Sequence, residues 1–209
     1  MLGGSGSPRE RAADRERAPR LTPHLRRRNL GFVVRWGEFA SLRPDLADAG
    51  RQLLYQYGVG LAFLATTRDD GGPRVHPMCP ILRDGDLYAF IVPSPKRHDL
   101  HRDGRYALHS FPADKNEDAF YLTGRGELIS DHDTTKALAS QFAMERGVSE
   151  PPAELTTWEL FSLDIESSLL TRTTGHGDPA PHHTVWNAPE AGTISASAAG
   201  SPTFPYALG

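Results

Sequence analysis

The segment from Gly60 to Phe111 constrains the fold more than any other part of the chain. It alternates short apolar stretches with the tight-turn sequences Asp69-Asp70-Gly71-Gly72 and Asp84-Gly85. Asp-Gly and Gly-Gly pairs between such stretches are typical of β-hairpin connections. The pattern predicts three strands in succession, over residues 60–67, 74–82 and 87–92. Pro77 and Pro80 interrupt the middle strand, which therefore belongs at a sheet edge or a bulge.

The rest of the central region supplies further strands and three helices. Helical periodicity and capping residues predict helices over 44–57, 95–102 and 131–146. Alternating patterns predict strands over 106–111, 119–130 and 158–171. Asp164 and Glu166 are expected on the solvent side of the last strand. Short strands joined by tight turns favour a mainly β fold, a six-stranded antiparallel barrel with peripheral helices.

The two ends of the chain differ from the centre in composition. Residues 1–33 are rich in arginine and poor in apolar periodicity, which predicts a disordered N-terminal extension. Two interpretations stay open: a basic arm for an anionic partner, or a translation start assigned too far upstream. Residues 34–187 are predicted to form the folded domain. Residues 188–209, rich in Ala, Ser, Gly and Pro, are predicted to be a flexible tail.

Composition narrows the class of protein. The formal net charge of −3 offers no basic field for nucleic acid, and no apolar run approaches the ~20 residues of a membrane span. Cys79 is the only cysteine, so no intrachain disulfide can form. A lone thiol and the absence of an apolar signal segment lead us to expect a cytoplasmic protein. Nine histidines are present without a convergent ligand set, and we predict no metal site.

A basic loop opens the helix predicted over 95–102. Ser94 offers a hydroxyl, Lys96 and Arg97 offer positive charge, and the first amides of the helix add a partial positive end. Arg74, on the neighbouring predicted strand, could add a bidentate fork. These residue types suit a phosphate group, although a solvated helix face explains the same charges equally well.

Several sequence blocks occur in a familiar order. They are Pro73-Arg74-Val75-His76-Pro77, Asp84-Gly85-Asp86-Leu87-Tyr88, Ser94 to Leu100, Asp103 to Leu108 and Phe120 to Arg125. In this order they resemble the pyridoxamine 5′-phosphate oxidase-like family of flavin-binding split β-barrels. The resemblance covers about residues 36–186. It implies a six-stranded split barrel that forms a homodimer, with FMN sites built from both subunits at the interface.

The resemblance also implies roles for individual residues. The family's phosphate contacts match Arg74, Ser94 and Lys96, beside which Arg97 adds charge. The segment that runs beside the isoalloxazine ring matches Val75, His76, Pro77 and Met78. His76 is a candidate for a hydrogen bond to the ring, or an edge-strand histidine in solvent.

The sequence departs from the family at its C-terminal end. Residues 175–186 lack the arginine-rich motif with which true pyridoxamine phosphate oxidases grip their substrate. An FMN-binding oxidoreductase acting on an unknown small molecule is therefore the main hypothesis. No catalytic side chain is assigned, because the flavin supplies the chemistry in this class. The alternatives are an F420-dependent reductase on the same barrel and a non-enzymatic flavin- or haem-binding protein.

Overall fold

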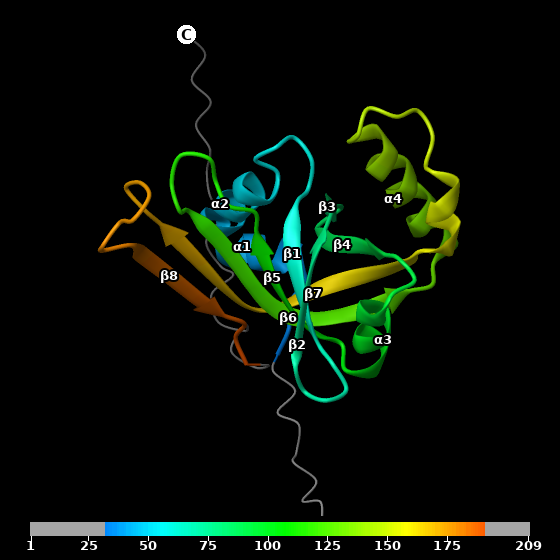
Figure 1. Cartoon of the computed structure of the whole chain (residues 1–209), viewed down its shortest axis with the longest axis horizontal. Coiled ribbons are helices and arrows are strands. Elements are labelled where there is room, and N and C mark those ends of the chain that lie inside the picture. The colour runs from blue at the N-terminus through cyan, green and yellow to red at the C-terminus, as the bar shows by residue number, and fades with distance from the viewer. Residues whose placement is uncertain (1–31, 191–209) are drawn as a thin grey trace, which may run out of the picture. The chain divides into compact units, whose positions relative to one another are not determined.

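A computed structural model describes residues 32–190 of the chain. Predictions made for residues 1–31 and 191–209 lie outside this range. The described part is built on one antiparallel sheet in the order β2-β1-β5-β6-β7-β4-β3, with β8 also paired to β7 (Figure 1). The strands are β1 Ala62–Thr67, β2 Pro73–Met78, β3 Pro80–Arg83, β4 Asp86–Ile91, β5 Arg105–Ser110, β6 Ala119–Ile129, β7 Glu159–Arg172 and β8 His182–Asn187.

The helices lie at the ends and on the faces of this sheet. Four are α-helical and one is a short 3₁₀ helix, η1. Their bounds are α1 Trp36–Leu42, α2 Pro44–Leu54, α3 Pro95–Arg102, α4 His132–Met144 and η1 Ala153–Thr157. None of these helices is long and apolar enough to cross a membrane.

The long strand β7 explains how the sheet curls and splits. It pairs with β6 along its length, with β4 through residues 159–162 and with β8 through residues 167–172. The register shifts between Thr123 and Gly124 of β6. Such a bulge bends a strand and increases its twist. The sheet therefore forms a curled half-barrel.

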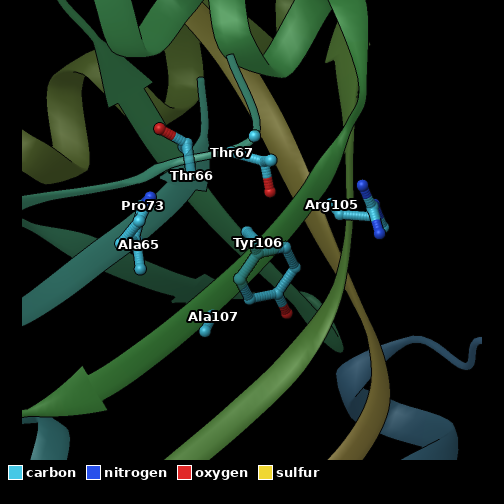
Figure 2. Close-up of a pocket in the computed structure, with 8 residues that line it drawn as sticks. Ala65, Thr66, Thr67, Pro73, Arg105, Tyr106 and Ala107 are labelled. Atoms are coloured by element: carbon cyan, nitrogen blue, oxygen red, sulfur yellow. The ribbon is translucent and has the colours of Figure 1, made fainter. Parts of the chain in front are cut away.

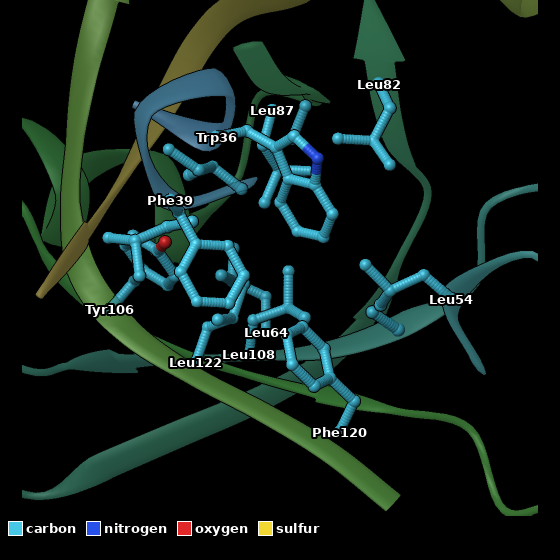
Figure 3. Close-up of a cluster of buried hydrophobic side chains, with 14 of the residues drawn as sticks. Trp36, Phe39, Leu54, Leu64, Leu82, Leu87, Tyr106, Leu108, Phe120 and Leu122 are labelled. Carbon is cyan, nitrogen blue, oxygen red and sulfur yellow. The ribbon is translucent and has the colours of Figure 1, made fainter. Parts of the chain in front are cut away.

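The main core fills the concave side of the half-barrel. Trp36 and Phe39 from α1 pack edge-on, with ring centroids 5.6 Å apart, and both approach Phe120 of β6 (Figure 3). Leu54 from α2 and Leu64 from β1 belong to the same buried cluster. Burial of these large side chains is the main source of stability for the barrel.

A second core lies under α4, on the other side of β4. Leu138 and Phe142 of α4 pack with Tyr88 and Phe90 of β4, and Trp158 joins them from the start of β7. Asp131 caps α4 by accepting a hydrogen bond of 2.7 Å from the Thr134 amide. This cap fixes where α4 begins over the sheet.

The mainly β split-barrel class predicted from the sequence is confirmed, with differences in detail. The described sheet has eight strands, because residues 74–82 form two strands that separate at Cys79. The segment 182–187, for which no strand was predicted, is strand β8. Helix α1 was not predicted. The helix expected over 95–102 has those bounds in the structure.

Candidate functional site

Helix α3 is the element on which the predicted phosphate site depends. Ser94 precedes it in extended conformation and Pro95 occupies its first turn, where a missing amide proton costs nothing. The helix ends at Asp103, whose amide donates to the Asp99 carbonyl over 2.9 Å. Leu100 is buried beneath it. Sequence signals therefore fix both the place and the length of α3.

Arg74 is joined to α3 through Asp99. The Nε atom of Arg74 donates to Oδ2 of Asp99 over 2.8 Å, and the Thr66 hydroxyl donates to the same oxygen over 2.8 Å. Asp99 is 6% exposed. Burial alone would raise the pKa of Asp99, but the hydrogen bonds from Arg74 and Thr66 outweigh burial and lower it. Asp99 is thus an ionised carboxylate that orients the Arg74 guanidinium.

A pocket of about 400 Å³ lies over this pair. Arg74, Pro95, His98 and Arg102 line it together with two carboxylates, Asp69 and Asp99. Arg102 donates to the Thr67 carbonyl, so its guanidinium is also held in place. The pocket combines two oriented guanidinium groups with the first turn of α3.

Lys96 lies half-buried on the first turn of the same helix. Burial lowers the pKa of its ammonium, which is close enough to the Cys79 thiol for the two to interact electrostatically. Within residues 32–190 no carboxylate lies at ion-pair distance from Lys96. A desolvated cation without a partner favours an anionic ligand.

Ser94 and Arg97 face other parts of the protein. The Ser94 hydroxyl donates to the Val92 carbonyl over 2.8 Å. Arg97 donates to the Thr157 carbonyl over 3.2 Å and lies 3.6 Å from Glu159, which also contacts His101 over 2.6 Å. Residues 96 and 97 point apart because successive positions on a helix differ by about 100°.

The segment predicted to run beside a flavin ring is the terminal strand β2. It pairs with β1, placing Val75 opposite Ala65 and Pro77 opposite Phe63. Val75 is 58% exposed, His76 and Pro77 are exposed, and Met78 is buried. A ligand could therefore reach the first three residues, and Met78 only through its backbone.

A shallower pocket of about 250 Å³ lies on the convex face of the sheet (Figure 2). Ala65, Thr67, Arg105 and Ala107 are among the residues that line it. Arg105 is bound to Asp103 over 2.6 and 2.8 Å, and these bonds lower the pKa of Asp103 to about 2. No sequence signal had marked this pocket.

An acidic pocket lies at the start of α4. Asp86, Glu127, Asp131 and Asp164 line it with Arg35. Burial, and then the charge of Glu127, raise the pKa of Asp164 to about 6. Asp164 lies on the face of β7 opposite the buried Leu163 and Ile165, as predicted, but it is half-buried because Arg35 and the start of α4 line the same pocket.

The residues present fit a phosphorylated cofactor in part. Arg74 and Lys96 supply two cations on elements that meet at α3, one oriented by Asp99 and the other unpaired. Ser94 and Arg97 are engaged elsewhere within the chain. Arg74 contacts α3 through Asp99 and lines the pocket over it, whereas Lys96 lies on the first turn of α3 outside the lining of that pocket. Asp99 belongs to the block from Ser94 to Leu100, but no role was predicted for it from the sequence.

Solved structures provide the comparison with known proteins. One solved chain has a TM-score of 0.52 and 18% identity, and the match covers 69% of this chain and 93% of that one. An F420 reductase matches with a TM-score of 0.47 and 20% identity over 56% of this chain and 94% of its own. No protein-family model and no curated protein matches the chain.

Two further solved proteins have lower scores. A Clostridium acetobutylicum protein related to general stress protein 26, of the pyridoxinephosphate oxidase family, has a TM-score of 0.45 and 13% identity over 72% of this chain and 95% of its own. A heme binding protein from Mycobacterium smegmatis has a TM-score of 0.44 and 15% identity over 65% of this chain and 57% of its own. At 18% identity, the likeness of this chain to the solved chain with a TM-score of 0.52 is one of fold alone.

Proposed function

We propose that this chain binds FMN through its phosphate at α3 and acts as a flavin-dependent oxidoreductase. The observation that carries the proposal is Lys96, a half-buried ammonium without a carboxylate partner in the described residues. An anion at this position offsets the cost of burying the charge. Arg74, held by Asp99 at 2.8 Å, lines the pocket over α3.

The other predicted contacts complete the proposed site. Ser94 begins the turn from which the first amides of α3 point outward, and Arg97 braces α3 against η1. Val75, His76, Pro77 and Met78 would lie along the ring. When bound, FMN supplies hydride and electron transfer, while the protein supplies binding and orientation.

The same proposal places the cofactor at a homodimer interface. The strand registers align Phe63, His109, Tyr121, Leu169 and Val185 in one row across five strands. The neighbours of these residues in each of the first four strands are buried, so the row lies on the convex face. Val185 is 61% exposed. Four of the five residues are aliphatic or aromatic and the fifth is His109, and such a row on an open sheet face suits a second copy of the chain.

Absorption spectroscopy tests the cofactor assignment. The purified full chain is titrated separately with FMN, F420 and haemin, and binding is followed by the spectral shift of each. Saturable binding of FMN at one molecule per chain supports the proposal. Preferential binding of F420 or haemin overturns FMN as the cofactor while leaving the barrel intact.

A second assay separates an oxidoreductase from a carrier or sensor. FMN-loaded protein is mixed with NADH or NADPH and an artificial electron acceptor. Turnover above that of free FMN supports an enzyme. Tight FMN binding without turnover favours the non-enzymatic alternative.

A further inference from the structure

An apolar pocket of about 460 Å³ lies between α4 and the segment that leads into β7. Figure 1 shows α4 beside this segment, which contains η1. The pocket shares no lining residue with the pocket over α3. Its volume falls within the range of about 300–1,000 Å³ found for small-molecule sites.

The inner walls of this pocket are apolar and well supported. Ala139 and Leu155 are 8% and 6% exposed, and Trp158 forms a third wall. The Trp158 ring packs edge-on against Phe142, with centroids 5.9 Å apart, which fixes its orientation. The Trp158 amide donates to the Leu155 carbonyl over 3.1 Å, so η1 holds these two walls together. A flat apolar group would find a preformed surface here.

Lys136 is the one Lys, Arg, Asp or Glu side chain among the residues that line the pocket. Lys136 and His132 lie on the α4 side, and no carboxylate is among the lining residues. In the part of the chain that the structure describes, neither side chain has a hydrogen-bond or ion-pair partner. Thr135 and Thr156 use their hydroxyl protons on the Asp131 and Ala153 carbonyls. A free cation beside apolar walls is complementary to an amphipathic anion.

We propose that this pocket binds a small, flat, apolar anion, such as an aromatic carboxylate or sulfonate. Its ring system lies against Trp158 and Leu155, and its anionic group pairs with Lys136. This inference does not depend on FMN binding, because the two pockets have separate walls.

Fluorescence titration with 1-anilinonaphthalene-8-sulfonate tests the proposal on the full chain. Saturable binding at one site is expected. Lys136→Ala weakens it about fivefold, as loss of an ion pair at the edge of a pocket implies, and Lys136→Arg retains it. The matched control is Lys115→Ala, which removes an exposed lysine elsewhere. The neutral probe N-phenyl-1-naphthylamine should be insensitive to Lys136→Ala.

A second variant keeps the test independent of charge. Ala153 is exposed at the rim, so Ala153→Trp should fold normally while filling the pocket. Loss of binding of both the anionic and the neutral probe in this variant supports the proposal. Equal affinities in Lys136→Ala, Lys115→Ala and the unmodified protein overturn it. An affinity that falls as protein concentration rises also overturns it, because a second copy would then cover the pocket. Repeating the titration with and without FMN separates this result from the cofactor assignment.

Discussion

Asp99 on α3 accepts hydrogen bonds from Arg74 of β2 and Thr66 of β1, each over 2.8 Å. One buried carboxylate therefore connects the terminal strand, its neighbour and the helix that carries Lys96. The connection gives Asp99 two roles. It stabilises the packing of α3, and it orients the guanidinium of Arg74 toward the pocket over α3.

Replacing Asp99 should separate these two roles. Asp99→Ala leaves Arg74 and Thr66 without their acceptor and should lower the free energy of unfolding by about 2 kcal/mol. Asp99→Asn keeps an acceptor oxygen and should cost about half as much. Urea unfolding measures both. Asp48→Asn, at an exposed position, serves as the control and should change stability by less than about 0.5 kcal/mol. Equal stability of Asp99→Ala and the control would show that the connection contributes little.

Asp164 should make stability depend on pH. Its pKa in the folded protein is about 6, above the ordinary value of 3.8, so the folded chain binds more protons than the unfolded chain between these values. The contribution of Asp164 to the free energy of unfolding is therefore fully present below about pH 4. It falls as the pH rises through 6. Because Asp164 is only partly buried, the loss should be on the order of 1 kcal/mol.

The variant Asp164→Asn isolates this effect. Its free energy of unfolding should match that of the parent near pH 4 and exceed it at pH 7. Denaturation at a series of pH values provides the measurement. Parallel curves for the two proteins across this range would contradict the raised pKa.

Gly124 of β6 lies close to the backbone of β7 at Asp164. A Cβ atom at this position would lie 1.8 Å from the Asp164 carbonyl oxygen, so the strands would have to separate. Gly124→Ala should lower stability by about 3 kcal/mol or more, or prevent folding. Gly175→Ala is the control, because no atom lies within 4 Å of its added methyl group. Thermal unfolding of Gly124→Ala at the parent's temperature would refute the close approach.

The row of residues from Phe63 to Val185 on the convex face should determine the oligomeric state. Leu169→Glu places a charge in the middle of the row and should convert a dimer into a monomer, since an unpaired charge at a buried interface is costly. Val148→Glu is matched to it, because Val148 is 48% exposed outside the sheet. Light scattering coupled to size exclusion gives the mass of each. A parent protein that is already monomeric, or a Leu169→Glu dimer, would contradict the proposed interface.

Local signals in the sequence predicted α3 and most of the strands. Helix α3 begins and ends at the residues predicted, because Pro95 marks its start and Asp103-Gly104 marks its end. Two kinds of element were missed. Helix α1 has only seven residues, too few for a clear period. Strand β8 lies at a sheet edge, and its contact with the core is made by Trp186, which packs on Phe39 with ring centroids 4.9 Å apart. A strand of this kind has little apolar alternation in its sequence.

The directions of site residues could not be predicted in the same way. Lys96 and Arg97 are adjacent in sequence, yet one lies near Cys79 and the other near Glu159. Their separation depends on how α3 is rotated against the sheet, which Leu100 fixes through burial in the main core. The burial of Asp164 likewise depends on α4 and Arg35, which are distant in sequence. Such contacts arise from tertiary packing and leave no local pattern.

The most direct test of the phosphate assignment compares FMN with riboflavin, which lacks the phosphate. Fluorescence quenching of each flavin gives its affinity for the parent protein, for Lys96→Ala and for the control Lys115→Ala. The parent and the control should bind FMN at least about tenfold more tightly than riboflavin, because a charge-assisted hydrogen bond contributes about 1.5–3 kcal/mol. In Lys96→Ala this preference should largely disappear. Equal binding of FMN and riboflavin by the parent, or an undiminished preference in Lys96→Ala, would contradict a phosphate site at α3.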